Sequence, residues 1–123
     1  MESKTAKVVN KPWGYEEIFA NTPSYVGKIL FIRQGETLSL QYHEVKEETL
    51  RVLDGELELV TGGDVDHLVS HQLGPGAVFH ISPGVLHRMV DTGDCRLLEV
   101  STNHLDDVVR LEDRYGREGT NAP

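Results

Sequence analysis

Several polar side chains between residues 41 and 87 are of types that can hold a metal ion. Gln41 and His43 stand in "SLQYHEVKEE", two glutamates follow at positions 47 and 48, and His87 lies in "ISPGVLHRMVD". Imidazole nitrogens and a carboxylate oxygen suit divalent Zn, Mn, Fe, Co or Ni, and neither stretch contains a thiolate that would favour a softer ion. Gln41 could add a weaker ligand through its amide oxygen. This pattern predicts one divalent transition-metal site, with one or two positions left for water or substrate.

Rigid strands would have to bring these residues together. Side chains alternate faces along a strand, so Gln41 and His43 fall on one side of residues 37–43. Leu38, Leu40 and Tyr42 fall on the other side. His87 follows a Pro-Gly corner, where another strand begins. The simpler alternative is a half-buried strand whose polar face meets water. The second histidine on β structure favours the metal site.

The rest of the chain has the spacing of an all-β sandwich or barrel. Turn signals such as "RQGE", "TGGD" and "LGPG" separate short stretches rich in Val, Ile, Leu and Phe. Asp54-Gly55 predicts a tight hairpin that pairs residues 49–53 with 56–60. A capped helical turn could follow Asn103. The 123 residues fit a single domain, 1–123, with its core at about 11–117 and a polar tail at 118–123.

Charge and composition exclude several classes of partner. Twelve Lys+Arg against 20 Asp+Glu give a formal charge of -8, which disfavours binding to nucleic acid or to an anionic membrane surface. No stretch reaches the roughly 20 apolar residues of a membrane span, and the first residues lack the apolar centre of a secretory signal. With a single cysteine, Cys95, no intrachain disulfide can form. These features fit a cytoplasmic protein.

Two motifs in the sequence resemble those of the cupins, a family of small jelly-roll β-barrels that hold a metal ion. The first motif keeps every family spacing from Gly35 through His43 and Glu48 to Gly55, with Gln41 where the general motif has its first histidine. The second motif is looser and places His87 after Pro83-Gly84, with Asp91 where asparagine is usual. The resemblance implies an all-β cupin jelly roll and the metal ligands Gln41, His43, Glu48 and His87.

Other stretches resemble one cupin in particular, the C-terminal domain of bacterial type II mannose-6-phosphate isomerases. That cupin carries the same Gln, an opening similar to "KPWGYEE" and a closing signature similar to "DDVVRLEDRYGR". Lys11 replaces an arginine of the opening, the usual His-rich run is reduced to "YHEVKEET", and the nucleotidyltransferase domain often fused to this cupin is missing from the sequence. The resemblance implies aldose-ketose isomerisation of a sugar phosphate through an enediol.

Such a reaction needs a general base and a grip on phosphate. The candidate bases are His80, Glu47 and Glu99, although a histidine within an apolar strand is often only packed and hydrogen-bonded. The candidate phosphate ligands are Arg114, Arg117, Arg33 and Lys11. Arg114 and Arg117 lie in the closing signature, and their simpler role would be to tie the chain end to acidic neighbours.

Two other functions share this fold, and one further expectation concerns association. Two histidines and a carboxylate also suit an Fe(II) cupin oxygenase that consumes O2. A non-catalytic sugar-binding cupin is the third possibility. Leu38, Leu40 and Tyr42 would face outward if Gln41 and His43 point into the barrel, and covering that apolar face predicts a homodimer.

Overall fold

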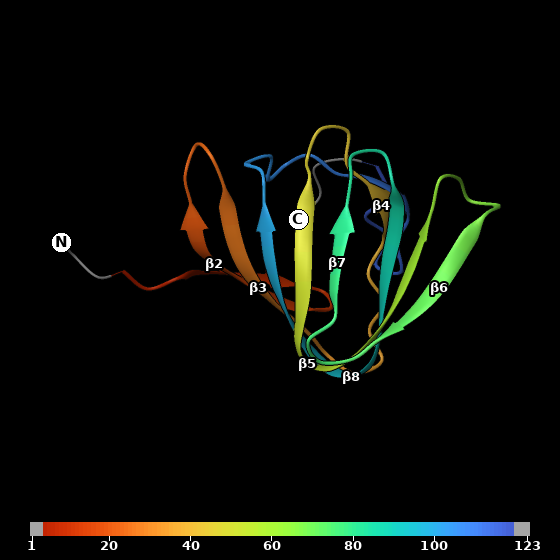
Figure 1. Ribbon diagram of the computed structural model, residues 1–123, viewed down its shortest axis with the longest axis horizontal. Coiled ribbons are helices and arrows are strands. Elements are labelled where there is room, and N and C mark those ends of the chain that lie inside the picture. Colours follow the sequence, from red (N-terminus) through yellow and green to blue (C-terminus); the bar gives the residue numbers. More distant parts are fainter. Residues whose placement is uncertain (1–3, 120–123) are drawn as a thin grey trace.

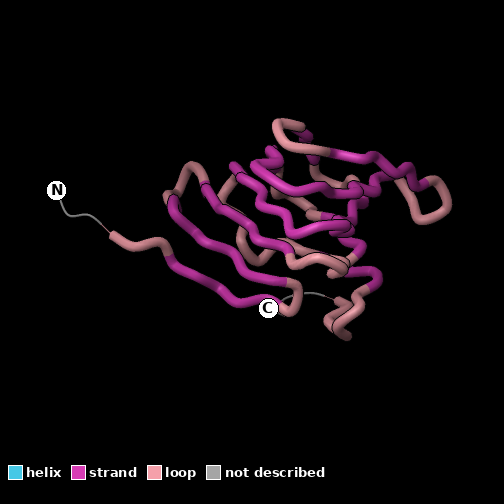
Figure 2. The backbone as a smooth tube through the Cα atoms, turned by 90° about the horizontal axis from the view of Figure 1, so that it is seen from below, coloured by secondary structure: helices cyan, strands magenta, loops and turns pink. Residues whose placement is uncertain are grey.

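The computed structural model describes residues 4–119, which form nine β-strands and no helix. Figure 2 shows strands joined by loops and turns alone. Among these residues no helix has the length and apolar character needed to cross a membrane. The strands are β1 (Lys7–Lys11), β2 (Gly14–Asn21), β3 (Val26–Ile32), β4 (Leu40–Tyr42), β5 (Glu48–Gly62), β6 (Leu68–Leu73), β7 (Val78–Ile81), β8 (Leu86–Ser101) and β9 (Val109–Glu112).

Two long strands, β5 and β8, organise the sheet. They pair antiparallel along nearly their whole length, from Glu48 opposite Ser101 to Gly62 opposite Leu86. One path through the sheet runs β1-β2-β3-β8-β4-β9, while β5 also pairs with β6 and β7. The sheet curls into an open barrel, with β8 bridging its two sides (Figure 1).

The inward side chains of the long strands fill one end of this barrel. Leu50, Val52, Leu57 and Leu59 of β5 pack with Leu97 of β8 in one buried cluster. Their alternation with exposed residues is what a sheet with one apolar face requires. Polar inward side chains lie at the strand ends instead: Glu48 begins β5, and Glu99 lies near the end of β8. Both line a cavity beside the apolar core.

The hairpin predicted at Asp54-Gly55 is wrong, because β5 continues without interruption through these residues. Both halves pair with β8 instead, and the register shifts between Asp54 and Glu56. Gly55 has φ +81°, and a Cβ atom there would lie 2.1 Å from the carbonyl oxygen of Asp94. The Asp-Gly pair therefore marks a bulge that bends one strand, a conformation with the same demand for positive φ as a tight turn.

The outward placement of Leu38 is also wrong, and Leu40 does not form an exposed apolar face. Regular strand begins only at Leu40, so the alternation of faces does not run through residues 37–39. Leu38 belongs to the buried core and Leu40 is 1% exposed. The homodimer stays a prediction, but it loses this apolar face as its reason.

The expectations for the last part of the chain have mixed outcomes. The helical turn expected after Asn103 is not formed. Residues 102–107, which follow β8, form bends and turns with short-range backbone hydrogen bonds instead. The expected polar tail lies largely outside the described residues. Within them, Gly119 exchanges two backbone hydrogen bonds with Arg110 of β9.

Candidate metal centre and cavity

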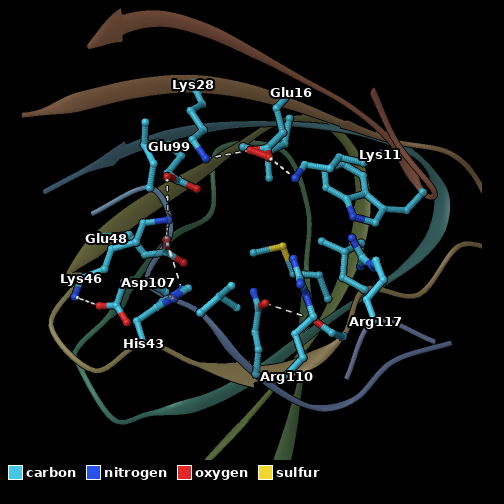
Figure 3. A pocket seen from close by; sticks show the side chains of 18 residues that line it. Lys11, Glu16, Lys28, His43, Lys46, Glu48, Glu99, Asp107, Arg110 and Arg117 are labelled. Atoms are coloured by element: carbon cyan, nitrogen blue, oxygen red, sulfur yellow. Dashed lines mark hydrogen bonds and ion pairs between the residues drawn. The ribbon is translucent and has the colours of Figure 1, made fainter. Parts of the chain in front are cut away.

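A cavity of about 100 Å³ opens at the polar end of the barrel and is lined by an unusual concentration of charge (Figure 3). Apolar side chains such as Trp13, Leu30 and Met89 form part of its wall. The rest includes five cationic side chains and four carboxylates. These are Lys11, Lys28, Lys46, Arg110 and Arg117, and Glu16, Glu48, Glu99 and Asp107.

His43, Glu48 and His87 come together at one side of the cavity. His43 follows β4, Glu48 begins β5, and His87 is the second residue of β8. The Glu48 carboxylate lies between the two rings, 3.7 Å from Nε2 of His43 and 3.8 Å from Nε2 of His87. One ligand atom from each of the three falls within 4.8 Å of the others. His43 and Glu48 line the cavity, while His87 is buried directly behind them.

Hydrogen bonds to the far side of each ring fix how the histidines face this cluster. Nδ1 of His43 contacts the backbone carbonyl of Asp107, and Nδ1 of His87 lies 3.0 Å from the carbonyl of Val85. Because a carbonyl oxygen only accepts, each Nδ1 carries the proton. Both rings therefore turn Nε2 toward Glu48, which is the arrangement of histidines that bind metals.

This cluster fits a divalent cation. Nε2 of His43 is buried and has no hydrogen-bond partner within the described part of the chain. Burial acts to raise the pKa of Glu48, but His43, Lys46 and His87 outweigh it and hold that pKa well below its ordinary value. Burial also lowers the pKa of His87, which favours the neutral form of its ring. Two imidazoles and one carboxylate are a donor set for a transition metal.

Gln41 lies beside the cluster, because it pairs with His87 across β4 and β8. Its amide nitrogen is 3.5 Å from Nε2 of His87, and its oxygen accepts a hydrogen bond of 3.0 Å from the Ser39 hydroxyl. The predicted ligand is the oxygen, which requires the amide to turn over. A hydroxyl both donates and accepts, so Ser39 can satisfy either orientation.

Next to this cluster stands a buried charge network that the sequence did not reveal. The ammonium of Lys46 lies 2.8 Å from Glu48 and 3.2 Å from Glu99. The Ser101 hydroxyl donates to the same Glu99 oxygen at 3.0 Å. Burial acts to lower the pKa of Lys46, yet the two carboxylates outweigh it and raise that pKa. Lys46 is therefore a permanent cation between two acidic groups.

The three candidate bases are separated by the structure. Glu99 lines the cavity, whereas His80 and Glu47 do not. These two pair with each other at 2.8 Å, with side chains 47% and 52% exposed. Because His80 pairs in register with Thr49, the residue after Glu48, it points to the opposite face of the sheet. A group that acts on a molecule in the cavity has to come from Glu99 or its neighbours.

The candidate phosphate ligands are divided in the same way. Lys11 and Arg117 line the cavity, while Arg33 and Arg114 are exposed and donate to the backbone carbonyls of Pro12 and Gly35. Arg117 also forms two contacts of 3.0 Å with Asp113, the simpler tethering role expected for it.

Arg110 was missed, although it stands in the same closing signature, since its inward direction depends on the register of β9 against β4. Figure 3 shows Lys11, Arg110 and Arg117 on the side of the cavity away from His43 and Glu48.

Comparison with known proteins identifies the family of this chain. Residues 29–101 match the family model described as "Cupin domain". The chain belongs to the cupin family. Over 94% of its length this cupin is 32% identical to the "Xanthan biosynthesis protein XanB" of Xanthomonas campestris pv. campestris. Over 94% of its length it is 34% identical to a "Mannose-1-phosphate guanylyltransferase" of Escherichia coli. It spans about a quarter of these curated relatives, 25% and 24% of their lengths.

The fold of this cupin is also found in solved structures. One is the crystal structure of CapF with the inhibitor 3-isopropenyl-tropolone, with a TM-score of 0.79 at 19% sequence identity. The match covers 89% of this cupin and 35% of that chain. At this identity the likeness concerns the fold alone, and the all-β cupin fold expected from the sequence is confirmed.

Proposed function

We propose that this cupin is a metal-dependent sugar-phosphate isomerase of the mannose-6-phosphate type. It would interconvert an aldose and a ketose by moving a proton between C2 and C1 through an enediol. One observation carries the proposal: a single cavity combines the cluster of His43, Glu48 and His87 with a further buried carboxylate, Glu99, and with a separate group of cations. Similarity to proteins named for mannose 1-phosphate and for xanthan biosynthesis supports a phosphorylated sugar as ligand.

The metal-binding residues would be His43, Glu48 and His87, with Gln41 as a fourth ligand after its amide turns. Bound there, a divalent ion would polarise the sugar oxygens and stabilise the negative charge that develops on them. The two backbone carbonyls behind the histidines keep both Nε2 atoms directed inward.

Glu99 is the proposed general base. Its carboxylate would take the proton from C2 of the aldose, while the electron pair of the C-H bond forms a C1-C2 double bond and the carbonyl electrons move onto O1. Transfer of the hydroxyl proton from O2 to O1 and return of the first proton from Glu99 to C1 would then leave the carbonyl group at C2. Both Ser101 and Lys46 contact one oxygen of Glu99, Oε2, and so hold the carboxylate in one orientation. A fixed base within reach of the substrate is what proton abstraction from carbon requires.

Lys46 is better suited to an electrostatic role than to proton abstraction. Its raised pKa keeps the ammonium protonated, so it cannot accept a proton near neutral pH. As a cation beside the reacting carbons it would lower the energy of the enediolate charge.

Lys11, Arg110 and Arg117 would bind the phosphate at the other side of the cavity. Burial lowers the pKa of Lys11 first of all. Its ion pair with Glu16 opposes this effect, and Lys28, Arg110 and Arg117 add to the lowering. Burial and then Arg117 likewise lower the pKa of Arg110. Glu16 and Asp113 offset part of the repulsion among these three cations, and an anion placed among them would relieve the rest.

A coupled assay tests the proposal. Purified protein reconstituted separately with Mn2+, Co2+ or Zn2+ is mixed with mannose 6-phosphate, and fructose 6-phosphate formation is followed. Glu99→Gln protein purified in parallel controls for host isomerases. Activity that needs metal and Glu99 is expected. Its absence with mannose 6-phosphate and with other aldose phosphates would contradict the proposal.

The two histidines and one carboxylate also favour an oxygenase as a second candidate. Oxygen uptake in the presence of Fe(II) distinguishes it, because isomerisation consumes no O2. A protein that binds sugar phosphates without either reaction would be the non-catalytic cupin considered above.

A further inference from the structure

The loop that carries the proposed metal ligands has little support from the sheet. Residues 43–47 belong to no strand, since β4 ends at Tyr42 and β5 begins at Glu48. His43, Lys46 and Glu48 nevertheless have to stay fixed around the cavity. Their support comes from the segment 102–108, which connects β8 to β9 and lies next to this loop.

One residue of that segment, Asp107, makes most of these contacts. Its carboxylate accepts three backbone N-H groups in succession: Oδ1 accepts from Glu44 at 3.0 Å, and Oδ2 accepts from Val45 at 2.7 Å and from Lys46 at 2.8 Å. These bonds define the path of the loop just after His43. Because the acceptor is charged, each bond is stronger than one between neutral groups.

The main chain of the same residue orients a metal ligand directly. The carbonyl oxygen of Asp107 accepts from Nδ1 of His43, which leaves Nε2 of that ring directed at Glu48. A single residue therefore sets both the backbone of the ligand loop and the direction of one histidine. Loss of such outer contacts usually costs about 10- to 100-fold in metal affinity.

We propose that Asp107 is a positioning residue of the metal centre, acting through His43 and the loop to Glu48. The inference rests on the metal site of the proposed function and does not depend on the reaction. It treats the chain segment after β8 as part of the site, although Asp107 stands far from both cupin motifs in the sequence.

The test compares Asp107→Asn with Asp106→Asn. Asn has a single acceptor oxygen, so its NH2 group would face at least one of the three N-H donors. Asp106 is the exposed neighbour, and its substitution makes the same change in size and charge. Both variants are titrated with Co2+, whose absorption spectrum reports on its ligands, and amide hydrogen exchange is measured over residues 43–48. An Asp107→Glu variant, which keeps the charge but displaces it by one methylene, covers the case in which Asp107→Asn does not fold.

Asp107→Asn is expected to weaken Co2+ binding by about 10- to 100-fold and to speed exchange at residues 44–46, with β5 and β8 unchanged. Asp107→Glu should show a smaller loss in the same direction. Co2+ affinity within twofold of the unmodified protein, or an equal loss in Asp106→Asn, would overturn the proposal. So would an unmodified protein that binds no Co2+. Normal Co2+ binding without isomerisation would contradict the proposed function and leave the role of Asp107 open to the same comparison.

Discussion

Two clusters of histidine and glutamate lie near the start of β5, on opposite sides of the sheet. On the inner face, Glu48 meets His43 and His87, and the side chains of the first two are only 3% and 5% exposed. On the outer face, Glu47 pairs with His80, with both side chains about half exposed. The residue types are the same and the two glutamates are adjacent in sequence.

Their surroundings give the two clusters different chemistry. Water screens the outer pair, and an exposed ion pair of this kind contributes roughly 0–1 kcal/mol to stability. The inner cluster holds donor atoms away from water, where an unpaired lone pair or charge is costly and a cation would be bound strongly. The side of the sheet on which the side chains lie, rather than residue type, decides which cluster can act on a ligand in the cavity.

The largest expected effect comes from the two candidate bases that this comparison separates. Glu99→Gln should lower the turnover of sugar-phosphate isomerisation by about 10²- to 10⁴-fold, the range for loss of a general base. Metal content, measured on the same preparation, should stay unchanged. Glu47→Gln is the matched control on the outer face and should retain full turnover. A large loss in Glu47→Gln with none in Glu99→Gln would reverse the assignment of the two faces.

Metal binding should separate the two histidines nearly as strongly. His43→Ala removes a proposed ligand, so Co2+ affinity should fall by more than the roughly 100-fold seen for outer contacts. His80→Ala should leave Co2+ affinity within twofold and change stability by less than about 0.5 kcal/mol. Isothermal titration calorimetry and thermal unfolding give both quantities. Equal affinities in the two variants would mean that the inner cluster does not hold the ion.

The sequence predicts the residues of the inner cluster, because motif spacing is local information. Gln41, His43 and Glu48 stand at the cupin spacings, and His87 follows its Pro-Gly corner. The structure places these side chains beside one another, as a strand-borne site requires. The cupin fold followed from the same motifs and from the regular turn signals.

What the sequence could not give depends on long-range register. Lys46 lies in a loop without alternation, so nothing local shows that it points between Glu48 and Glu99. The outward direction of His80 follows from its pairing with Thr49, more than thirty residues away. The prediction of a hairpin at Gly55 was wrong for a related reason. A tight turn and a bulge both favour glycine, and only the pairing with the partner strand distinguishes them.

A moderate effect is expected at the cationic side of the cavity, where inner and outer arginines can be compared. Arg110→Gln should raise the KM for a sugar phosphate about tenfold, with turnover nearly unchanged. This factor corresponds to the lower end of the free energy that a hydrogen bond to a charged group contributes. Arg114→Gln, which changes an exposed side chain, should leave KM unchanged. Competition by inorganic phosphate should weaken in parallel with KM in the first variant. A KM effect confined to Arg114→Gln would move the phosphate site out of the cavity.

The smallest effect concerns Asp91, a third buried carboxylate that sharpens the contrast with Glu48 and Glu99. Those two share the ammonium of Lys46, whereas Oδ2 of Asp91 has no hydrogen-bond partner among residues 4–119. Oδ1 accepts the N-H of Gly93 at 2.9 Å. Burial first of all, and then Asp94, raises the pKa of Asp91 above its ordinary value. The folded protein therefore binds this proton more readily than the unfolded chain does.

The sign of the resulting pH dependence follows from that raised pKa. Below the unfolded pKa of about 3.9 the carboxyl is neutral in both states, and it costs the folded protein nothing. As the pH rises through the folded pKa, the buried charge appears and stability is lost.

Asp91→Asn keeps the acceptor for Gly93 and removes the charge, so it should stabilise the protein at pH 7 by up to about 1 kcal/mol. Urea unfolding of both proteins from pH 4 to pH 8 should show this gain growing with pH. A gain that is constant across the range, or largest at pH 4, would show that the charge of Asp91 is compensated after all, as the charges of Glu48 and Glu99 are.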